Sequence, residues 1–205
     1  MITIIDIGIS NIKSITRGFV TQDYQVRVTS DPADVRLADS LVLPGVGAFP
    51  KAMEILRSRG LVEAIREHAG CGKPLIGICL GMQLLFTDSS EHEHTEGLGL
   101  IPGHVVRFPS DRPVPHMGWN SVDQARESIL FRGIRNPSDF YFVHSYYAEP
   151  DNEEHVVGVS EHFGKFTAAV QKDSIYGTQF HPEKSQNNGL TLLSNFAQLT
   201  EKQGK

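Results

Sequence analysis

The sequence predicts an α/β fold in which a mostly parallel central sheet carries helices on both faces and continues into an antiparallel extension. In the first half of the chain, short β-branched runs alternate with helical patterns, an alternation that builds parallel sheets covered by helices. In the second half, strand-like segments follow one another closely, with turns between them, which favours antiparallel pairing. Since we find no repeat, linker or low-complexity tract, we expect a single domain over residues 1–205.

The predicted elements of the first half are strands separated by helices. The strands are expected at residues 2–6, 24–29, 40–43 and 74–79. Apolar residues at helical spacing predict one helix over residues 11–22 and two over residues 51–68, broken near Gly60. The apolar run within residues 75–78 suits a strand covered on both sides, because neither face needs polar residues.

The second half is predicted to be rich in strands and to close with a helix. The strands are expected at residues 98–108, 121–122, 140–149, 156–160, 167–171 and 175–179. Helical spacing predicts a final helix over residues 189–202. The boundary between the halves, residues 89–97, is predicted to be an exposed loop.

Composition excludes several classes of function. The net charge is −5 and the basic residues are scattered, so we expect no nucleic-acid ligand. No stretch reaches the ~18 uninterrupted apolar residues of a membrane helix, so we expect no membrane partner. The two cysteines, Cys71 and Cys79, fit neither a disulfide framework nor a zinc site, which indicates a reducing, cytoplasmic location.

The segment around Cys79 is typical of a nucleophile elbow. It follows a predicted buried strand, precedes an apolar-faced helix, and has Gly77 and Gly81 two residues away on either side. A sharp strand-to-helix turn needs small neighbours, because bulk beside the nucleophile would clash. The helix N-terminus favours a thiolate, and the Leu80 N–H becomes a natural donor to an oxyanion. The alternative is a buried structural cysteine, the more common role of this residue.

A candidate base stands near the end of the last predicted strand. There His181 precedes Pro182 and Glu183, and proline fixes the turn so that the imidazole and the carboxylate can approach each other. Glu183 can then orient one ring nitrogen while the other faces the thiol. A capped surface turn is the alternative for this short pattern alone.

The remaining histidines carry weaker signals. His92 and His94 form an H-x-H pair in a polar loop without a third ligand at suitable spacing, so we assign no metal. His116 and His144 lie in aromatic-rich, strand-like segments, where a hydrogen-bonded structural histidine is expected.

Taken together, the motifs resemble the class I glutamine amidotransferases, whose signature is a G-x-C-x-G elbow followed about a hundred residues later by Q-F-H-P-E. The similarity is closest to the glutaminase subunits of imidazole glycerol phosphate synthase in histidine biosynthesis, the HisH family. Four further segments carry it: residues 43–49, 115–120, 141–147 and 181–185. The resemblance implies a flavodoxin-like, three-layer glutaminase fold without a cofactor.

The resemblance also implies roles for individual residues. The glycines around Val46 allow a peptide flip that would point the Val46 N–H at the oxyanion, beside Leu80; a tight turn after a strand is the alternative. The residues expected to help hold L-glutamine are Gly45, Gly47, Gln83, His144, Ser145 and Tyr146. Those expected at the interface with a (β/α)₈-barrel cyclase subunit, which would form a heterodimer with this chain and receive its ammonia, are Met117, Trp119 and Asn120.

One loop departs from the family pattern. Residues 6–11 read Asp-Ile-Gly-Ile-Ser-Asn, whereas the family more often has an aromatic after the aspartate and a second glycine before the asparagine. Three alternatives stay open, and only the first of them follows from this loop. They are a paralogous glutaminase that feeds a surface-sugar amidation system, a peptidase or γ-glutamyl hydrolase on the same fold, and an inactive regulatory subunit.

Overall fold

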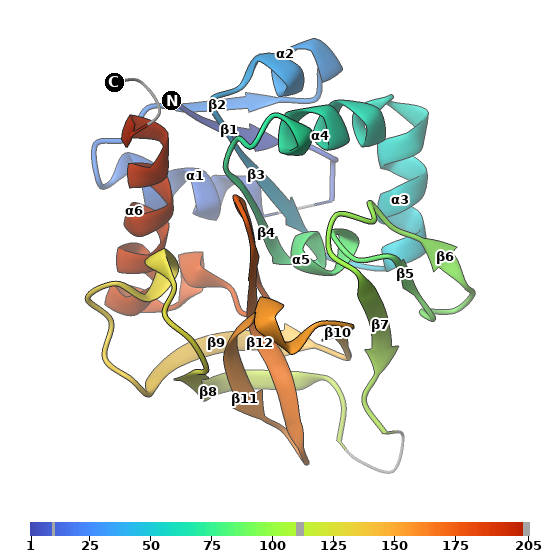
Figure 1. Cartoon of the computed structure of the whole chain (residues 1–205), viewed down its shortest axis with the longest axis vertical. Helices are drawn as coiled ribbons and strands as arrows, with labels where there is room; N and C mark the ends of the chain where they lie inside the picture. Colours follow the sequence, from blue (N-terminus) through green and yellow to red (C-terminus); the bar gives the residue numbers. More distant parts are fainter. Residues whose placement is uncertain (10, 110–112, 203–205) are drawn as a thin grey trace.

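A nine-stranded sheet forms the centre of the computed structural model, which describes residues 1–9, 11–109 and 113–202 (Figure 1). Its order is β2-β1-β3-β4-β13-β12-β11-β8-β9. The parallel strands are β1 (Ile2–Ile5), β2 (Val26–Thr29), β3 (Ser40–Gly45), β4 (Leu75–Cys79) and β13 (Ile175–Thr178). The antiparallel strands are β12 (Lys165–Lys172), β11 (Val156–Glu161), β8 (His116–Gln124) and β9 (Ser138–His144). The predicted parallel sheet with an antiparallel extension is confirmed.

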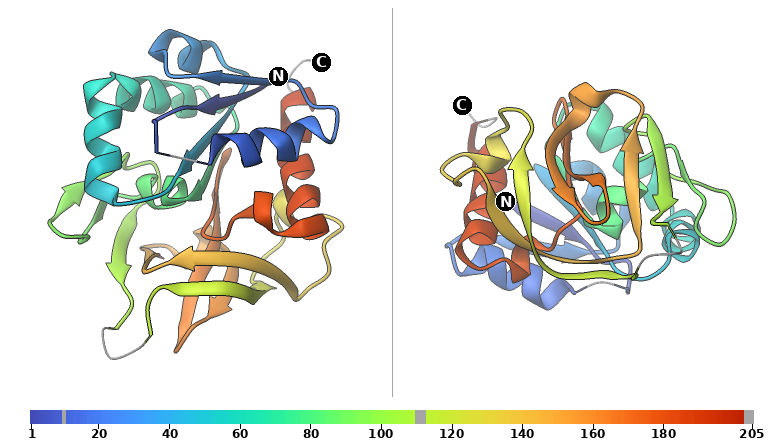
Figure 2. Two further views of the ribbon diagram at one scale, coloured as in Figure 1. Left: turned by 180° about the vertical axis from the view of Figure 1, so that it is seen from behind. Right: turned by 90° about the horizontal axis from the view of Figure 1, so that it is seen from below.

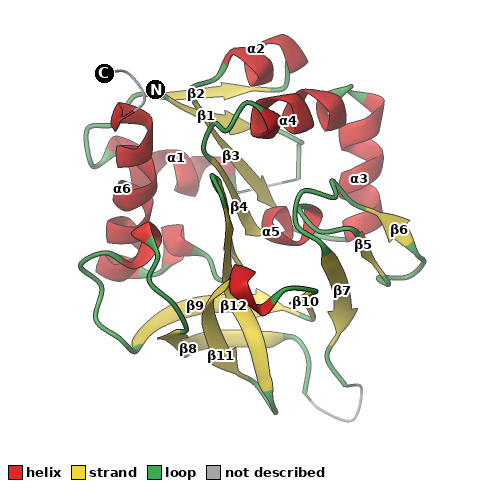
Figure 3. Ribbon diagram, viewed as in Figure 1, coloured by secondary structure: helices red, strands yellow, loops and turns green. Residues whose placement is uncertain are grey.

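Helices cover both faces of the parallel part, as the sequence predicts (Figures 1 and 3). On one side lie α1 (Ile12–Val20) and α6 (Gln186–Lys202), which contact each other. On the other lie α3 (Phe49–Ser58) and α4 (Leu61–Gly70), separated at Gly60 by a left-handed residue (φ +66°). Alternate residues of β1 enter different cores: Ile4 packs with α1 and α6, and Ile5 with α3 and α4. This two-sided burial explains the uninterrupted apolar runs.

The second half differs from the predicted pattern at several points. The predicted strand over residues 140–149 is two strands, β9 and β10 (Tyr146–Pro150), which belong to different sheets. Residues 98–102 form a loop, so the strand predicted over 98–108 shortens to β7 (Gly103–Arg107). The two-residue strand predicted at 121–122 is the nine-residue β8.

A second, smaller sheet of order β10-β7-β5-β6 was not predicted. Its strand β6 (Thr95–Glu96) and the second residue of strand β5 (Asp88–Ser89) lie within the segment predicted as an exposed loop, and Ser89 and Glu91 there are buried. This part of the prediction is wrong because two-residue strands leave no periodic signal. The short helix α2 (Pro32–Leu37) was also missed, although Asp31 caps it through the Ala33 N–H.

Strand register determines where the site lies. In the parallel part, Gly45 pairs with Cys79 across β3 and β4, and Thr178 pairs with Ile78 across β13 and β4. The carboxyl ends of three neighbouring strands therefore meet at one edge of the sheet. Figure 2 shows β8 and β9 crossing close to this edge from the other half of the chain. Ligands of open α/β sheets bind at such edges.

Candidate active site

Cys79 occupies a strained turn at the end of β4. Its backbone has φ +55° and ψ −112°, and the next residue begins the short helix α5 (Leu80–Leu84). A Cβ on Gly81 would lie 1.8 Å from the Leu43 carbonyl oxygen, and one on Gly77 would lie 2.4 Å from the Gly81 oxygen. Only glycine fits at both positions. The predicted elbow is present, and strain of this kind is concentrated at functional sites.

His181 and Glu183 approach each other through the turn that Pro182 makes. Nδ1 of His181 lies 2.8 Å from Oε1 of Glu183, and both side chains are buried. Burial opposes a charge on His181, but the side chains of Cys79 and Glu183 outweigh it and raise its pKa to about 10. His181 Nε2 makes no hydrogen bond to any described residue. The remaining ring nitrogen is therefore available for chemistry beside the sulfur.

Ser185 holds the histidine turn against β9. Its hydroxyl donates to the His181 carbonyl at 2.6 Å and accepts from the Tyr141 N–H at 3.0 Å. The His181 N–H donates in turn to the Tyr141 carbonyl at 2.9 Å. These backbone bonds fix the distance between β9 and the base, although β9 and β13 are not neighbours in the sheet.

A pocket of about 320 Å³ opens over Cys79 and His181. Its size lies at the lower end of the range for small-molecule sites. The pocket is lined by Val46, Gly47, Cys79, Leu80, Gln83, Glu91, Pro115, Val143, His144, Ser145, Tyr146 and His181. It contains every residue predicted to hold substrate or oxyanion except Gly45, which packs beneath it against Leu80 and Gly81.

Sequence reasoning missed Glu91. Its segment was predicted to be a solvated loop, but its Oε2 accepts the Phe49 N–H at 2.7 Å, and the side chain lines the pocket. The bond also satisfies a free N–H in the first turn of α3. No local signal could reveal this contact, because the two residues are 42 positions apart in the chain.

The two predicted oxyanion donors, the N–H groups of Leu80 and Val46, differ in their hydrogen bonding. The Leu80 N–H stands at the first position of α5, where helix geometry leaves donors unpaired. The Val46 N–H instead donates to the Ile9 carbonyl at 3.1 Å. Gly47 has φ +97°, and a Cβ there would meet no atom within 4 Å. The loop at residues 6–11, which departs from the family pattern, thus binds the Val46 N–H through the Ile9 carbonyl. Ser10 of this loop lies outside the described residues.

Comparison with known proteins identifies the family of the chain. Residues 3–199 match the model of the family "Glutamine amidotransferase class-I". Two proteins named imidazole glycerol phosphate synthase subunit HisH are each 49% identical to the chain. The one from Syntrophotalea carbinolica covers 97% of this chain and 100% of its own, and the one from Moorella thermoacetica 99% and 97%. The chain belongs to the class-I glutamine amidotransferases, in the HisH group.

Solved structures support the fold of this amidotransferase. "Structure of PurLQS from Thermotoga maritima" matches with a TM-score of 0.76 at 16% identity, covering 100% of this chain and 98% of the other. A second protein from Thermotoga maritima, described as a glutamine amidotransferase, gives a TM-score of 0.65 at 16% identity, covering 99% and 84%. At such low identity these matches support the fold alone.

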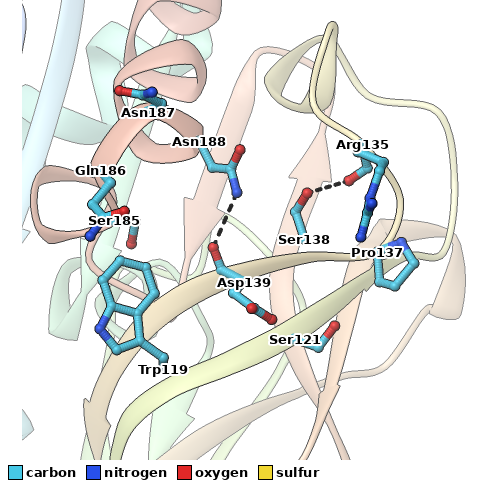
Figure 4. A pocket seen from close by; sticks show the side chains of 10 residues that line it. All are labelled: Trp119, Ser121, Arg135, Pro137, Ser138, Asp139, Ser185, Gln186, Asn187 and Asn188. Atoms are coloured by element: carbon cyan, nitrogen blue, oxygen red, sulfur yellow. Dashed lines mark hydrogen bonds between the residues drawn. The ribbon is translucent and has the colours of Figure 1, made fainter.

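The residues predicted to face a partner lie on β8 of the amidotransferase, outside the catalytic pocket. Met117 is 66% exposed and Trp119 50% exposed, whereas Asn120 is half-buried and hydrogen-bonded. Figure 4 shows the Trp119 indole among the side chains that line a second pocket. That pocket is lined by Trp119, Ser121, Arg135, Pro137, Ser138, Asp139, Ser185, Gln186, Asn187 and Asn188. Ser185 belongs to this pocket and also holds the catalytic turn.

Metal ligation and membrane insertion find no support in the described ranges. Within them, no three His, Cys, Asp or Glu side chains cluster closely enough to hold a metal ion. No helix in that part of the chain combines the length and apolar character that a bilayer crossing requires.

Proposed function

We propose that Cys79 attacks the side-chain carboxamide of L-glutamine and that His181 protonates the departing amide nitrogen, which leaves as ammonia. His181 then activates a water molecule, which hydrolyses the γ-glutamyl thioester to L-glutamate. The observation that carries this proposal is the buried pair of His181 and Glu183, whose free Nε2 shares the pocket with the strained Cys79. The raised pKa of His181 supports its role as the proton donor.

The oxyanion of each tetrahedral intermediate would lie between two backbone donors. The Leu80 N–H supplies one. The second is the Val46 N–H, which must leave the Ile9 carbonyl and turn into the pocket. Rotation of this peptide changes ψ of Gly45, where glycine adds no Cβ, and the space around Gly47 supports movement of the adjoining loop. A site that gains its second donor only when a partner binds would hydrolyse glutamine slowly in isolation.

The pocket offers complementary groups to each end of glutamine. Glu91 carries the carboxylate that faces an α-ammonium, and Gln83 adds a carboxamide. Residues Val143–Tyr146 supply backbone groups where β9 ends and β10 begins. This arrangement favours an amino acid over a peptide, because the free ammonium group has a charged partner.

We infer that the ammonia passes to a (β/α)₈-barrel cyclase subunit in a cytoplasmic heterodimer. The names of the relatives, each a subunit of imidazole glycerol phosphate synthase, support this partner. The exposed side chains of Met117 and Trp119 support β8 as part of the interface, since tryptophan often anchors such contacts.

The nine-stranded sheet uses strands from both halves of the chain, which supports the inference that residues 1–205 form one domain.

The decisive experiment is purification of the chain from its native cell, identification of any barrel partner, and a glutaminase assay with and without that partner. We expect a cyclase to co-purify and to raise the hydrolysis rate. Full activity of the isolated chain, with no synthase recovered, would contradict the channelled-ammonia proposal. Recovery of a sugar-amidating enzyme instead would assign the chain to the paralogous system.

A further inference from the structure

Two series of hydrogen-bonded side chains beside the pocket both end at the carbonyl oxygen of Tyr146. Each series is called a hydrogen-bonded chain below. Nδ1 of His144 lies 2.8 Å from it, and Nε2 of Gln83 donates to it at 2.9 Å. A carbonyl oxygen has two lone pairs, so these two donors saturate it. The backbone of this part of the substrate site is therefore held from two directions.

The first chain runs from β8 to Tyr146 through two histidines. His116 and His144 face each other across β8 and β9, with Nδ1 of His116 at 2.9 Å from Nε2 of His144. Nε2 of His116 lies 3.0 Å from Nδ2 of Asn120. Asn120 stands next to the exposed Trp119, so these hydrogen bonds connect the exposed surface of β8 with the pocket.

The direction of donation along this chain is set independently at both ends. The Tyr146 carbonyl can only accept, so His144 carries its proton on Nδ1 and accepts at Nε2. At the other end, Asn120 accepts from the Ser121 N–H and donates to the Glu161 carbonyl, which fixes its amide with nitrogen toward His116. Both ends require the same tautomer of His116, protonated on Nδ1 alone. A second proton on either ring would place two donors face to face.

The second chain runs from Tyr146 to the nucleophile. Nε2 of Gln83 also donates to Oε1 of Gln179 at 3.0 Å, which leaves Nε2 of Gln179 directed at the Cys79 sulfur, 3.9 Å away. Gln179 is completely buried and follows β13, where its backbone N–H donates to Ala168. Because both amide protons of Gln83 are used, only its Oε1 remains to accept from a ligand in the pocket.

We propose that His116 and Gln179 are positioning residues of this site, where His116 locks His144 and the Tyr146 carbonyl, and Gln179 directs an N–H at the Cys79 sulfur. The proposal rests on the glutaminase function proposed above. His116 acts on substrate binding because it acts through His144 and Tyr146, which line the pocket. Gln179 acts on turnover because it adjoins the sulfur.

Kinetics of variants in the complex with the native partner test the role of His116. In His116→Phe the ring remains, but His144 loses its donor, and we expect KM for glutamine to rise roughly tenfold or more with little change in kcat. His116→Asn places an amide N–H where Nδ1 was and should restore most of the affinity. His162→Phe is the matched control, because His162 stacks on His116 with ring centroids 4.4 Å apart but lies outside both chains.

The role of Gln179 is tested by Gln179→Met, which keeps the length of the side chain and removes both hydrogen bonds. We expect kcat to fall roughly tenfold, with a smaller change in KM. Gln171→Met is the control, because Gln171 bonds Ser128 and does not line the pocket. Equal losses in a variant and its control, or no rescue by His116→Asn, would overturn the positioning roles.

Nitrogen NMR of histidine-labelled protein tests the chain without any reference to activity. We expect both His116 and His144 to be neutral at neutral pH and protonated on Nδ1 only. A proton on Nε2 of either ring would overturn the proposal, whether or not the complex hydrolyses glutamine. The tautomers could be as expected while the complex has no glutaminase activity. The proposed function would then fail, and the positioning roles of His116 and Gln179 would fail with it. The hydrogen bonds between His116, His144 and Tyr146 would still be confirmed.

Discussion

The Val46 N–H donates to the Ile9 carbonyl at 3.1 Å and so points away from the pocket over Cys79. The two residues come from loops that follow neighbouring parallel strands, β1 and β3. Of the two proposed oxyanion donors, the Leu80 N–H is therefore in place and the Val46 N–H is bound elsewhere. Turning the Gly45–Val46 peptide would break this backbone hydrogen bond and change ψ of Gly45 and φ of Val46.

Val46→Pro tests the second donor, because proline has no N–H. In the complex with its partner we expect kcat to fall about a hundredfold or more, the loss typical of removing one oxyanion donor, while KM changes little. Val46→Ala, which keeps the N–H, is the control and should retain most of the activity. Equal turnover in the two variants, with equal thermal stability, would remove Val46 from the oxyanion site.

Glu91→Gln tests recognition of the α-ammonium group. Glutamine keeps an oxygen that accepts the Phe49 N–H, so we expect the fold to persist and the charge alone to be lost. The KM for glutamine should rise roughly tenfold or more, since a hydrogen bond to a charged group contributes about 1.5–3 kcal/mol. Glu93→Gln in the same segment is the control. An unchanged KM would show that Glu91 serves only to hold α3.

Gly81→Ala tests the packing of the elbow. The added methyl group would overlap the Leu43 carbonyl, so β3 and α5 would have to separate. We expect the free energy of unfolding to fall by at least about 2 kcal/mol, which is within the usual cost of overpacking. Gly70→Ala at the end of α4 has free space and should change stability by less than about 1 kcal/mol. Denaturant unfolding of both variants makes the comparison.

Stability in acid should depend on His116 and His144. Burial, with His162 nearby, lowers the pKa of His116 to about 4, and burial lowers that of His144 to about 3, both from 6.5. The folded protein keeps these rings neutral while the unfolded chain binds protons below about pH 6.5. Their contribution to stability is therefore complete above that pH and is lost as the pH falls toward about 4.

Denaturant unfolding between neutral pH and about pH 4 measures this dependence. Other groups also titrate in this range, so the informative quantity is the difference between the native chain and His116→Phe. The variant has one such histidine fewer and should lose less stability over the same interval. Equal slopes would contradict a neutral His116 in the folded state.

Local patterns in the sequence were enough to predict the parallel half and the elbow. Apolar runs such as β4 are continuous because both faces are buried, and the glycines beside Cys79 leave room for two carbonyl groups, that of Gly81 in the same turn and that of Leu43 on β3. The same reasoning could not divide residues 140–149 at Ser145. The alternation of side chains continues through that point, and only the choice of neighbouring strand changes.

What the sequence could not reveal depends on contacts between distant segments. The pairing of His116 with His144 follows from the register of β8 against β9. Glu91 reaches the pocket because it binds the first turn of α3. The direction of the Val46 N–H depends on an acceptor, Ile9, in a different loop. None of these relations has a periodicity or a motif that a single sequence displays.

The most direct test of the central claim compares glutamine hydrolysis by the native complex with that of Cys79→Ala and Cys71→Ala. Both cysteines are free thiols, but Cys71 is exposed at the end of α4, and Cys79 is buried at the elbow. We predict that Cys79→Ala abolishes hydrolysis while still binding glutamine and the partner, and that Cys71→Ala hydrolyses glutamine at the native rate. Glutamine hydrolysis by Cys79→Ala at a rate close to that of Cys71→Ala would contradict the account.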